Sequence, residues 1–418
     1  MHNMNILSQH WSTIQGFLFP SLREKLGPLS RQHMQVISTI ELLRVEDFIK
    51  VHFGYVGRPP KDRVAIAHAF IAKALLNLPF TSSLLDRLQV DVILRQICGW
   101  ESKKSIPSES TFSRAFAEFA NSELLKKIHE ILIKRNLKGH LFGHVSRDST
   151  AIEGREKRKK AKKLEDVAHG SDVSVNMERE REVSEEKPEC TPVQGTESSS
   201  NQYVQVTAGK RKRGRPKNSK KKIKPPTRLE RQQKMSLEEM LEDLPKSCDL
   251  GCKRSRGYKE TWKGYKLHLD VSDGQIPISC ILTSASLADS QVAIPLSVMT
   301  SERITNLYDL MDSAYDSEII KEYSRSLGHV PIIEMNPRRN KKKQQESKAE
   351  PKRLKLLNIQ MPATVRYNER NSVERVNGRL GNEFGGQMVR VRGHAKVMTH
   401  LMFGILALTV DQLMRFIL

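Results

Sequence analysis

The chain has 418 residues and a formal net charge of +22 at pH 7, with 38% hydrophobic and 6% aromatic residues. This length suffices for two or three domains, but so few apolar residues argue against a chain that is folded throughout. Five scattered cysteines exclude a disulfide framework and indicate a reducing cytoplasm. A chain this basic usually binds a polyanion, nucleic acid above all, although a ribosome-associated or merely well-solvated protein would carry the same charge.

The two ends of the chain give no sign of export or membrane insertion. The N-terminus lacks the continuous apolar core of a signal peptide. Residues 397–418 are the most apolar stretch, but they include His400, Asp411 and Arg415. A bilayer-spanning helix rarely tolerates so many polar groups, so we expect a helix packed on a protein core. Cys248 and Cys252 lack the second close pair that a zinc site needs.

Residues 1–140 are expected to form a helical domain. Apolar residues recur at helical spacing over residues 64–78 and 84–97, and Gly99 ends the second run. A third helix opens at Pro107 and carries Phe112 and Phe116 on its buried side. Such an arrangement suits a helix-turn-helix that binds DNA, but periodicity alone equally fits an ordinary bundle.

Residues 154–245 are charged and almost free of apolar clusters, so we predict a mostly disordered insertion. A short helix is expected near residues 236–244. Within the insertion, Arg213 and Arg215 flank Gly214 and precede Pro216, a pattern like that of an AT-hook. The two arginines could enter a narrow minor groove, although a generic basic linker would look the same.

Regular structure is expected on both sides of this insertion, at residues 141–153 and 246–418. Strands are predicted near residues 144–148, 263–271, 276–283, 307–312 and 330–334, and helices near 290–299, 317–327 and 368–380. Strand–helix–strand units favour right-handed parallel crossovers, and the opening hairpin adds an antiparallel edge. The sequence therefore predicts an α/β mixed sheet flanked by helices, in the element order of a ribonuclease-H-like fold, preceded by the all-α domain.

Three acidic residues stand where such a fold brings them together. Asp148 lies on the first strand, Asp312 at the end of the strand 307–312, and Glu374 on the late helix. Three carboxylates of this kind can hold two Mg²⁺ ions roughly 3.5–4 Å apart for phosphodiester chemistry. Each residue alone could instead be a cap or a surface ion-pair partner. Asp309 and Asp316 are local rivals of Asp312, although Asp309 should point to the opposite face.

The predicted late helix carries two further candidate residues. Tyr367 and Arg370 are spaced so that they share one helical face with Glu374. Arg370 could hold a phosphate with two hydrogen bonds, and Tyr367 could stack on a displaced nucleotide.

From about residue 60 to its end, the chain resembles the DDE transposases of bacterial insertion sequences. Tyr367, Arg370 and Glu374 match the family's Tyr-x2-Arg-x3-Glu signature. The family often has a lysine seven residues after the Glu, where this chain has Gly381, with Arg379 close by. The other segments that resemble the family are residues 58–60, 84–88, 107–114, 146–150, 263–266, 288–290 and 312–317.

This resemblance implies an enzyme that binds the terminal inverted repeats of its element, cleaves there and joins the freed 3′ ends to target DNA. Asp148, Asp312 and Glu374 would be the catalytic metal ligands, with Mg²⁺ as cofactor and Mn²⁺ able to substitute. Two ends must be brought together, so a homodimer or larger assembly on double-stranded DNA is implied, in the bacterial cytoplasm at the nucleoid. Two alternatives stay open: a ribonuclease-H-like nuclease without strand transfer, and an inactive, transposase-derived DNA-binding regulator.

Overall fold

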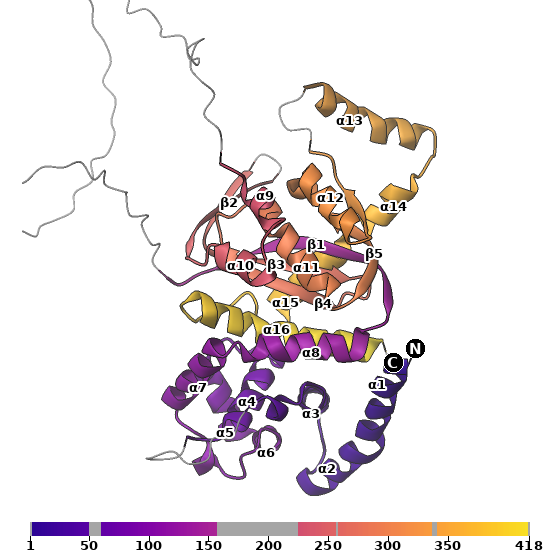
Figure 1. Cartoon of the computed structure of the whole chain (residues 1–418). Coiled ribbons are helices and arrows are strands. Elements are labelled where there is room, and N and C mark those ends of the chain that lie inside the picture. Colours follow the sequence, from indigo (N-terminus) through magenta and orange to yellow (C-terminus); the bar gives the residue numbers. More distant parts are fainter. Residues whose placement is uncertain (1, 50–59, 157–224, 256–257, 337–340, 417–418) are drawn as a thin grey trace, which may run out of the picture. The chain divides into compact units, whose positions relative to one another are not determined.

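The computed structural model describes residues 2–49, 60–156, 225–255, 258–336 and 341–416 (Figure 1). Residues 1–160 and 226–418 form one compact unit. Most of the predicted insertion, including Arg213 and Arg215, lies outside the described residues. Its end does not, because α9 (Arg228–Gln232) and α10 (Leu237–Asp243) are helical, which confirms the helix expected near residue 240. Met240 and Leu244 are buried, so this end contributes to the core.

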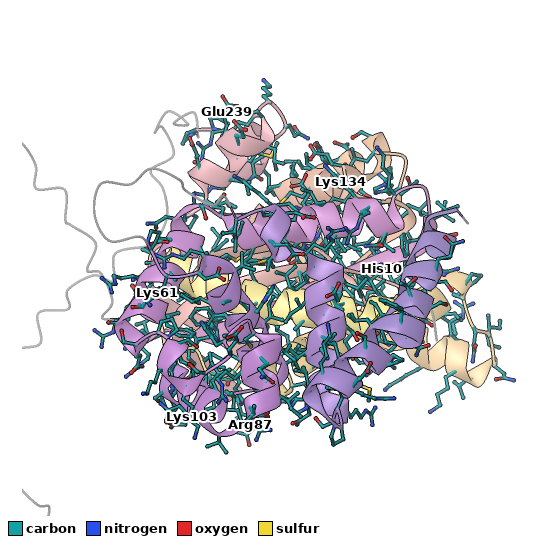
Figure 2. The ribbon with its side chains drawn as sticks, turned by 90° about the horizontal axis from the view of Figure 1, so that it is seen from below. His10, Lys61, Arg87, Lys103, Lys134 and Glu239 are labelled. Carbon is teal, nitrogen blue, oxygen red and sulfur yellow. The ribbon has the colours of Figure 1, made fainter. Side chains whose placement is uncertain are left out.

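The helical region before the sheet contains shorter helices than the periodicity predicts. Asp91 accepts a hydrogen bond from the Leu94 amide and starts a new helix, which divides the expected helix over residues 84–97. Glu123 adopts a left-handed conformation (φ 52°) and separates α7, which ends at Asn121, from α8, which begins at Leu124. The described helices are α1 (His2–Thr13), α2 (Phe19–Leu26), α3 (Arg31–Leu43), α4 (Arg63–Leu75), α5 (Thr81–Val90), α6 (Val92–Ile97), α7 (Glu109–Asn121) and α8 (Leu124–Leu137). Figure 2 shows Lys61, Arg87 and Lys103 on the outer surface of this region.

A six-stranded mixed sheet follows, and it confirms the predicted ribonuclease-H-like fold. Its strands are β1 (Leu141–Glu153), β2 (Asp249–Ser255), β3 (Tyr258–Ser272), β4 (Pro277–Ser284), β5 (Thr305–Met311) and β6 (Val330–Ile333). The order is β2-β3-β1-β5-β6, with β4 also paired to β3. β1, β5 and β6 run parallel, whereas β3 is antiparallel to β1 and β4. β2 was not among the predicted strands, because its residues lack a clear apolar alternation.

Helices pack on both faces of the sheet. α11 (Ala293–Ser301) and α12 (Glu318–Ser326) cover the face on which Arg147, Asp270 and Asp309 lie. Thr300 on α11 donates a hydrogen bond to Asp270, and Ser324 on α12 donates one to Asp309. α15 (Asn371–Asn382) covers the opposite face, where Ser372 donates to Ser146. α13 (Lys341–Leu356) and α14 (Pro362–Asn368) connect β6 to α15 (Figure 1).

The C-terminal helix α16 (His394–Arg415) forms the centre of the main hydrophobic core. It is the one helix in the described part of the chain that is long and apolar enough to cross a membrane, and 89% of its most apolar window is buried inside the protein. It lies alongside α8 (Figure 1) and also contacts α3, α4, α7 and β4. Its Phe403 ring lies 5.4 Å from that of Phe70. The expectation of a helix packed on a core is thus confirmed, and this helix joins the helical region to the sheet.

Candidate active site

The pairing of β1 with β5 brings two of the predicted acidic residues side by side. These strands are parallel, and their register pairs Arg147 with Met311, so Asp148 is the next residue of β1 and Asp312 directly follows β5. Asp312 caps the following 3₁₀ turn (Ser313–Tyr315), where its side chain accepts a hydrogen bond from the Ala314 amide at 3.0 Å. Side chains at equal register on neighbouring parallel strands share a face, so both carboxylates lie on the same face of the sheet.

Both carboxyl groups lie in surroundings that disfavour two negative charges. Burial, together with the negative charge of Asp312, raises the pKa of Asp148 from 3.8 to about 6, although Arg370 acts to lower it. Burial also raises the pKa of Asp312, with a further contribution from the nearby charges of Asp289 and Glu334. A site that keeps two partly buried acids together is electrostatically suited to bind a cation.

Glu374 reaches the same face of the sheet through α15. The Ser372 hydroxyl donates to Ser146 Oγ at 3.1 Å, and Val373 and Val376 are fully buried in the main core. These contacts fix the first turns of α15 against β1. The Glu374 side chain is 51% exposed, and it pairs at 2.6 Å with the Arg370 side chain, which is 17% exposed.

Arg370 is the centre of this cluster. Its charge lowers the pKa of both Asp148 and Asp312, and its guanidinium lies 5.8 Å from the centre of the Tyr367 ring. The Tyr367 hydroxyl donates to Glu334 at 3.1 Å. The structure therefore brings Asp148, Asp312, Tyr367, Arg370 and Glu374 into one neighbourhood.

The helix predicted over residues 368–380 is present as α15, but the prediction that Tyr367, Arg370 and Glu374 share one helix is wrong. α14 ends at Asn368 and α15 begins at Asn371. Between them the chain forms tight turns, in which the Arg370 amide donates to the Tyr367 carbonyl at 3.0 Å and the Val373 amide donates to the Arg370 carbonyl. The tighter turn changes the helical phase, but Arg370 still lies next to both Tyr367 and Glu374.

The two rival aspartates have other partners. Asp309 is buried on the opposite face, where it accepts hydrogen bonds from Ser324 on α12 and from Asn306, and its carboxylate lies 3.2 Å from His329. Asp316 pairs with Lys321 at 2.6 Å and accepts a hydrogen bond from the Asn336 amide. Neither carboxylate is therefore as available to bind a cation as those of Asp148 and Asp312.

A buried ion pair that was not predicted from the sequence lies directly beneath the two site aspartates. Arg147 is 2% exposed and forms two hydrogen bonds of 2.7 Å with Asp270, its cross-strand partner on β3. Asp270 also accepts a hydrogen bond from Thr300 at 2.7 Å. Because an uncompensated buried charge is costly, this pair ties β1, β3 and α11 together under the site. Only the alternation of Arg147 with Asp148 along β1 hinted that Arg147 points inward.

Two further groups near Asp312 were also missed. Tyr315 is fully buried, and its hydroxyl has no hydrogen-bond partner among the residues that the structure describes. Burial and the neighbouring charge of Asp289 raise its pKa well above the usual range, so it stays neutral. Asp289 itself is held by Lys266 at 2.9 Å.

The donor set suits a divalent cation of the hard, oxygen-binding kind. Asp148 and Asp312 offer carboxylate oxygens whose mutual repulsion a cation would relieve. Within the described ranges, however, no three His, Cys, Asp or Glu side chains gather closely enough to hold a metal ion together. Glu374 is instead paired with Arg370. Arg379 pairs with Glu383 and Asp411, so its charge is neutralised by carboxylates of the same chain.

Comparison with protein families identifies the chain. The model of a transposase DDE domain matches residues 246–410, which include Asp312 and Glu374, and the model of a transposase domain (DUF772) matches residues 24–118. A search of the curated proteins finds no match, and neither does a search of the solved structures. Transposases with this domain act on DNA and use divalent metal ions. The two matches together cover more than half of the chain, which belongs to the DDE transposases of insertion sequences.

Proposed function

We propose that this transposase binds the terminal inverted repeats of its insertion sequence, cleaves the DNA there and joins the freed 3′ ends to target DNA, with Mg²⁺ held by Asp148, Asp312 and Glu374. The single observation that carries the proposal is the register of β1 and β5, in which Asp148 and Asp312 each come one residue after the Arg147–Met311 pair. Asp148 lies outside the matched DDE segment, so its assignment depends on this geometry and on the resemblance of residues 146–150 to the family.

The raised pKa of Asp148 gives these carboxylates their role. Two partly buried acids close together favour a proton or a metal ion over two bare charges. Bound divalent cations would stabilise the charge that develops on the attacking and leaving oxygens of a phosphodiester. Asp148 and Asp312 would hold the cations in place, because the buried Arg147–Asp270 pair fixes β1 beneath them.

Arg370 has two roles in this proposal. In the described arrangement it neutralises Glu374 through a 2.6 Å contact. When DNA enters, Arg370 would turn to a phosphate oxygen, which a guanidinium binds well, and Glu374 would be free to complete the carboxylate set. Tyr367, beside Arg370, would stack on a nucleotide near the cleaved bond.

The other parts of the chain would supply DNA affinity. We assign residues 1–140 to a helical DNA-binding domain, residues 141–153 and 246–418 to the catalytic domain, and residues 154–245 to a basic insertion. Arg213 and Arg215 in this insertion would contact the minor groove. The net charge of +22 supports extensive phosphate contact. Joining two DNA ends requires at least a dimer at the nucleoid.

The test is cleavage and joining of a supercoiled plasmid that carries both ends of the element, with Mg²⁺, with Mn²⁺ and with EDTA. We expect metal-dependent cutting at the ends and joined products from the wild type. Asp148→Asn, Asp312→Asn and Glu374→Gln should each abolish cutting and leave DNA binding largely intact.

Glu383→Gln is the matched control for Glu374→Gln. Glu383 directly follows α15 and pairs with Arg379 at four residues' separation. Its side chain is 52% exposed, and that of Glu374 is 51% exposed. This control should cut normally. Cutting without joining would replace the proposal with a nuclease, and tight DNA binding without cutting would replace it with an inactive regulator. Cutting by Asp312→Asn would show that Asp312 is not a metal ligand.

A further inference from the structure

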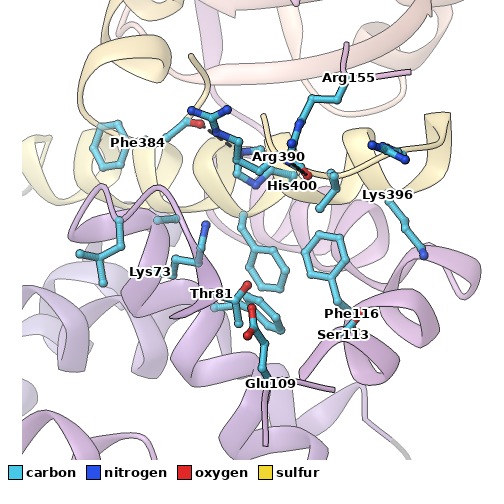
Figure 3. Close-up of a pocket in the computed structure, with 17 residues that line it drawn as sticks. Lys73, Thr81, Glu109, Ser113, Phe116, Arg155, Phe384, Arg390, Lys396 and His400 are labelled. Carbon is cyan, nitrogen blue, oxygen red and sulfur yellow. Dashed lines mark hydrogen bonds between the residues drawn. The ribbon is translucent and has the colours of Figure 1, made fainter. Parts of the chain in front are cut away.

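A second basic site lies away from the carboxylates, in a cavity between the helical region and the C-terminal segment. Its volume is about 400 Å³. α4, α7 and α16 form its walls together with the segment 384–392 (Figure 3). Five cationic side chains line it, whereas Glu109 is the one acidic side chain that does: Lys73, Arg155, Arg390, Arg392 and Lys396.

Lys73 is the most informative of these residues. It lies on α4, and burial lowers the pKa of its ammonium to about 8. Its one hydrogen bond in the described structure runs to the Pro79 carbonyl, at 3.4 Å, and no described carboxylate forms an ion pair with it. A half-buried ammonium without a counter-ion is costly to the fold, so its presence at the cavity wall favours an anionic ligand.

The arginines around Lys73 are held in place. The Arg155 guanidinium donates to the Arg390 carbonyl at 3.4 Å, and the Arg390 guanidinium stacks 5.1 Å from the centre of the Phe80 ring. His400 is neutral, since burial lowers its pKa to about 4 and it donates to the Gly385 carbonyl. Arg155 and Arg390 therefore have contacts at the cavity before any ligand binds.

Two elements lead from the candidate active site to this cavity. β1 carries Asp148, and Arg155 follows seven residues later, roughly 20 Å along an extended chain. α15 carries Glu374 and ends at Asn382, about 12 Å along the helix axis and just before Phe384 in the cavity wall. One strand of a B-DNA duplex rises about 3.4 Å per nucleotide along the helix axis, so about four to six nucleotides would span this separation.

We propose that this cavity binds a backbone phosphate of the DNA strand, about four to six nucleotides from the cleaved bond, with Lys73 and Arg390 as the main contacts. The identity of the polyanion rests on the proposed function. The apolar floor, which includes Phe70, Phe116 and Phe403, suits the sugar or base of the same nucleotide. The site would thus hold the DNA in register while the carboxylates act on it.

The test uses the full-length protein with the substitution Lys73→Met, which keeps the side chain's length and removes its charge. Lys134→Met is the control, because Lys134 on α8 pairs with Glu130 at 2.7 Å and lies outside the cavity. Equilibrium binding is measured against salt concentration, with a duplex that carries the element's end and with an unrelated duplex of equal length. We expect Lys73→Met to bind both about tenfold more weakly and to lower the salt slope by about 1.

A scan with single neutral methylphosphonates then locates the contact. In the wild type, one or two positions four to six nucleotides from the cleaved bond should weaken binding when neutralised, and Lys73→Met should be insensitive at those positions. The melting temperature of Lys73→Met should not fall, since a desolvated charge has been removed. The proposal is overturned if Lys73→Met binds as tightly as Lys134→Met, or if the scan gives the same profile for both variants.

Plasmid cleavage by the wild type separates this proposal from the proposed function. Metal-dependent cutting without any effect of Lys73→Met on binding would overturn the cavity's role alone. A Lys73-dependent phosphate contact without cutting at the ends would support the cavity and overturn the proposed function.

Discussion

Replacing Asp148 with Asn tests whether the candidate site stores electrostatic repulsion for a metal to relieve. In the folded protein, burial and the neighbouring Asp312 raise the pKa of Asp148 from 3.8 to about 6. Above pH 6 the ionised carboxylate therefore destabilises the folded state relative to the unfolded chain. Asn carries no charge and cannot ionise, so without metal the substitution should stabilise the protein.

The magnitude follows from the two pKa values. At pH 7.5 the raised pKa of Asp148 lowers the free energy of unfolding by about 3 kcal/mol. At pH 5, where the carboxyl is protonated in the folded protein and ionised in the unfolded chain, it lowers that free energy by about half as much. Below pH 3.8 both states are protonated and the cost disappears. The stabilising effect of Asp148→Asn should therefore shrink as the pH falls from 7.5 to 5.

The assay is denaturant unfolding in EDTA at pH 7.5 and pH 5, for the wild type, Asp148→Asn and the control Asp86→Asn. Asp86 is an exposed residue of α5, so its substitution should be close to neutral at both pH values. The addition of Mg²⁺ should stabilise the wild type, because the ion binds the folded state, and should stabilise Asp148→Asn much less.

Equal stability of wild type and Asp148→Asn in EDTA would refute the reasoning, because no repulsion would then be present. A stabilisation that is the same at pH 7.5 and pH 5 would refute it too, since the gain would not come from the titration of this carboxyl. Equal stabilisation of both proteins by Mg²⁺ would place the ion elsewhere.

Two further predictions concern the residues around the carboxylates. Arg147→Met should lower the free energy of unfolding by about 3–5 kcal/mol, measured by denaturant unfolding, because it leaves Asp270 buried and unpaired. The double variant that also carries Asp270→Leu should recover most of this loss. If it recovers none, the pair does not have this structural role. Arg370→Gln should reduce plasmid cutting by about a hundredfold or more through the loss of a phosphate contact. Arg379→Gln, which breaks the analogous pair with Glu383, should leave the cutting rate unchanged, and an equal loss in both variants would show that Arg370 acts only through the helix.

The sequence by itself determined the kind of fold and two of its key positions. Helical periodicity placed α4 and α16, and alternating apolar residues placed the later part of β3, because these patterns depend on neighbours only a few residues apart. The positions of Asp148 and Asp312 on or just after predicted strands were equally legible. The break in the helical run at Asp91 could also be read locally, since aspartate is a common helix cap.

The tertiary structure alone decided which side chains meet. The register that sets Asp148 beside Asp312 joins strands more than 150 residues apart, and no local pattern encodes it. The Arg147–Asp270 pair and the basic cavity around Lys73 likewise bring together distant residues whose own neighbourhoods look ordinary. Local propensity sets the helices and strands, but the charges that they bury depend on how they pack, because desolvation and pairing act through space rather than along the chain.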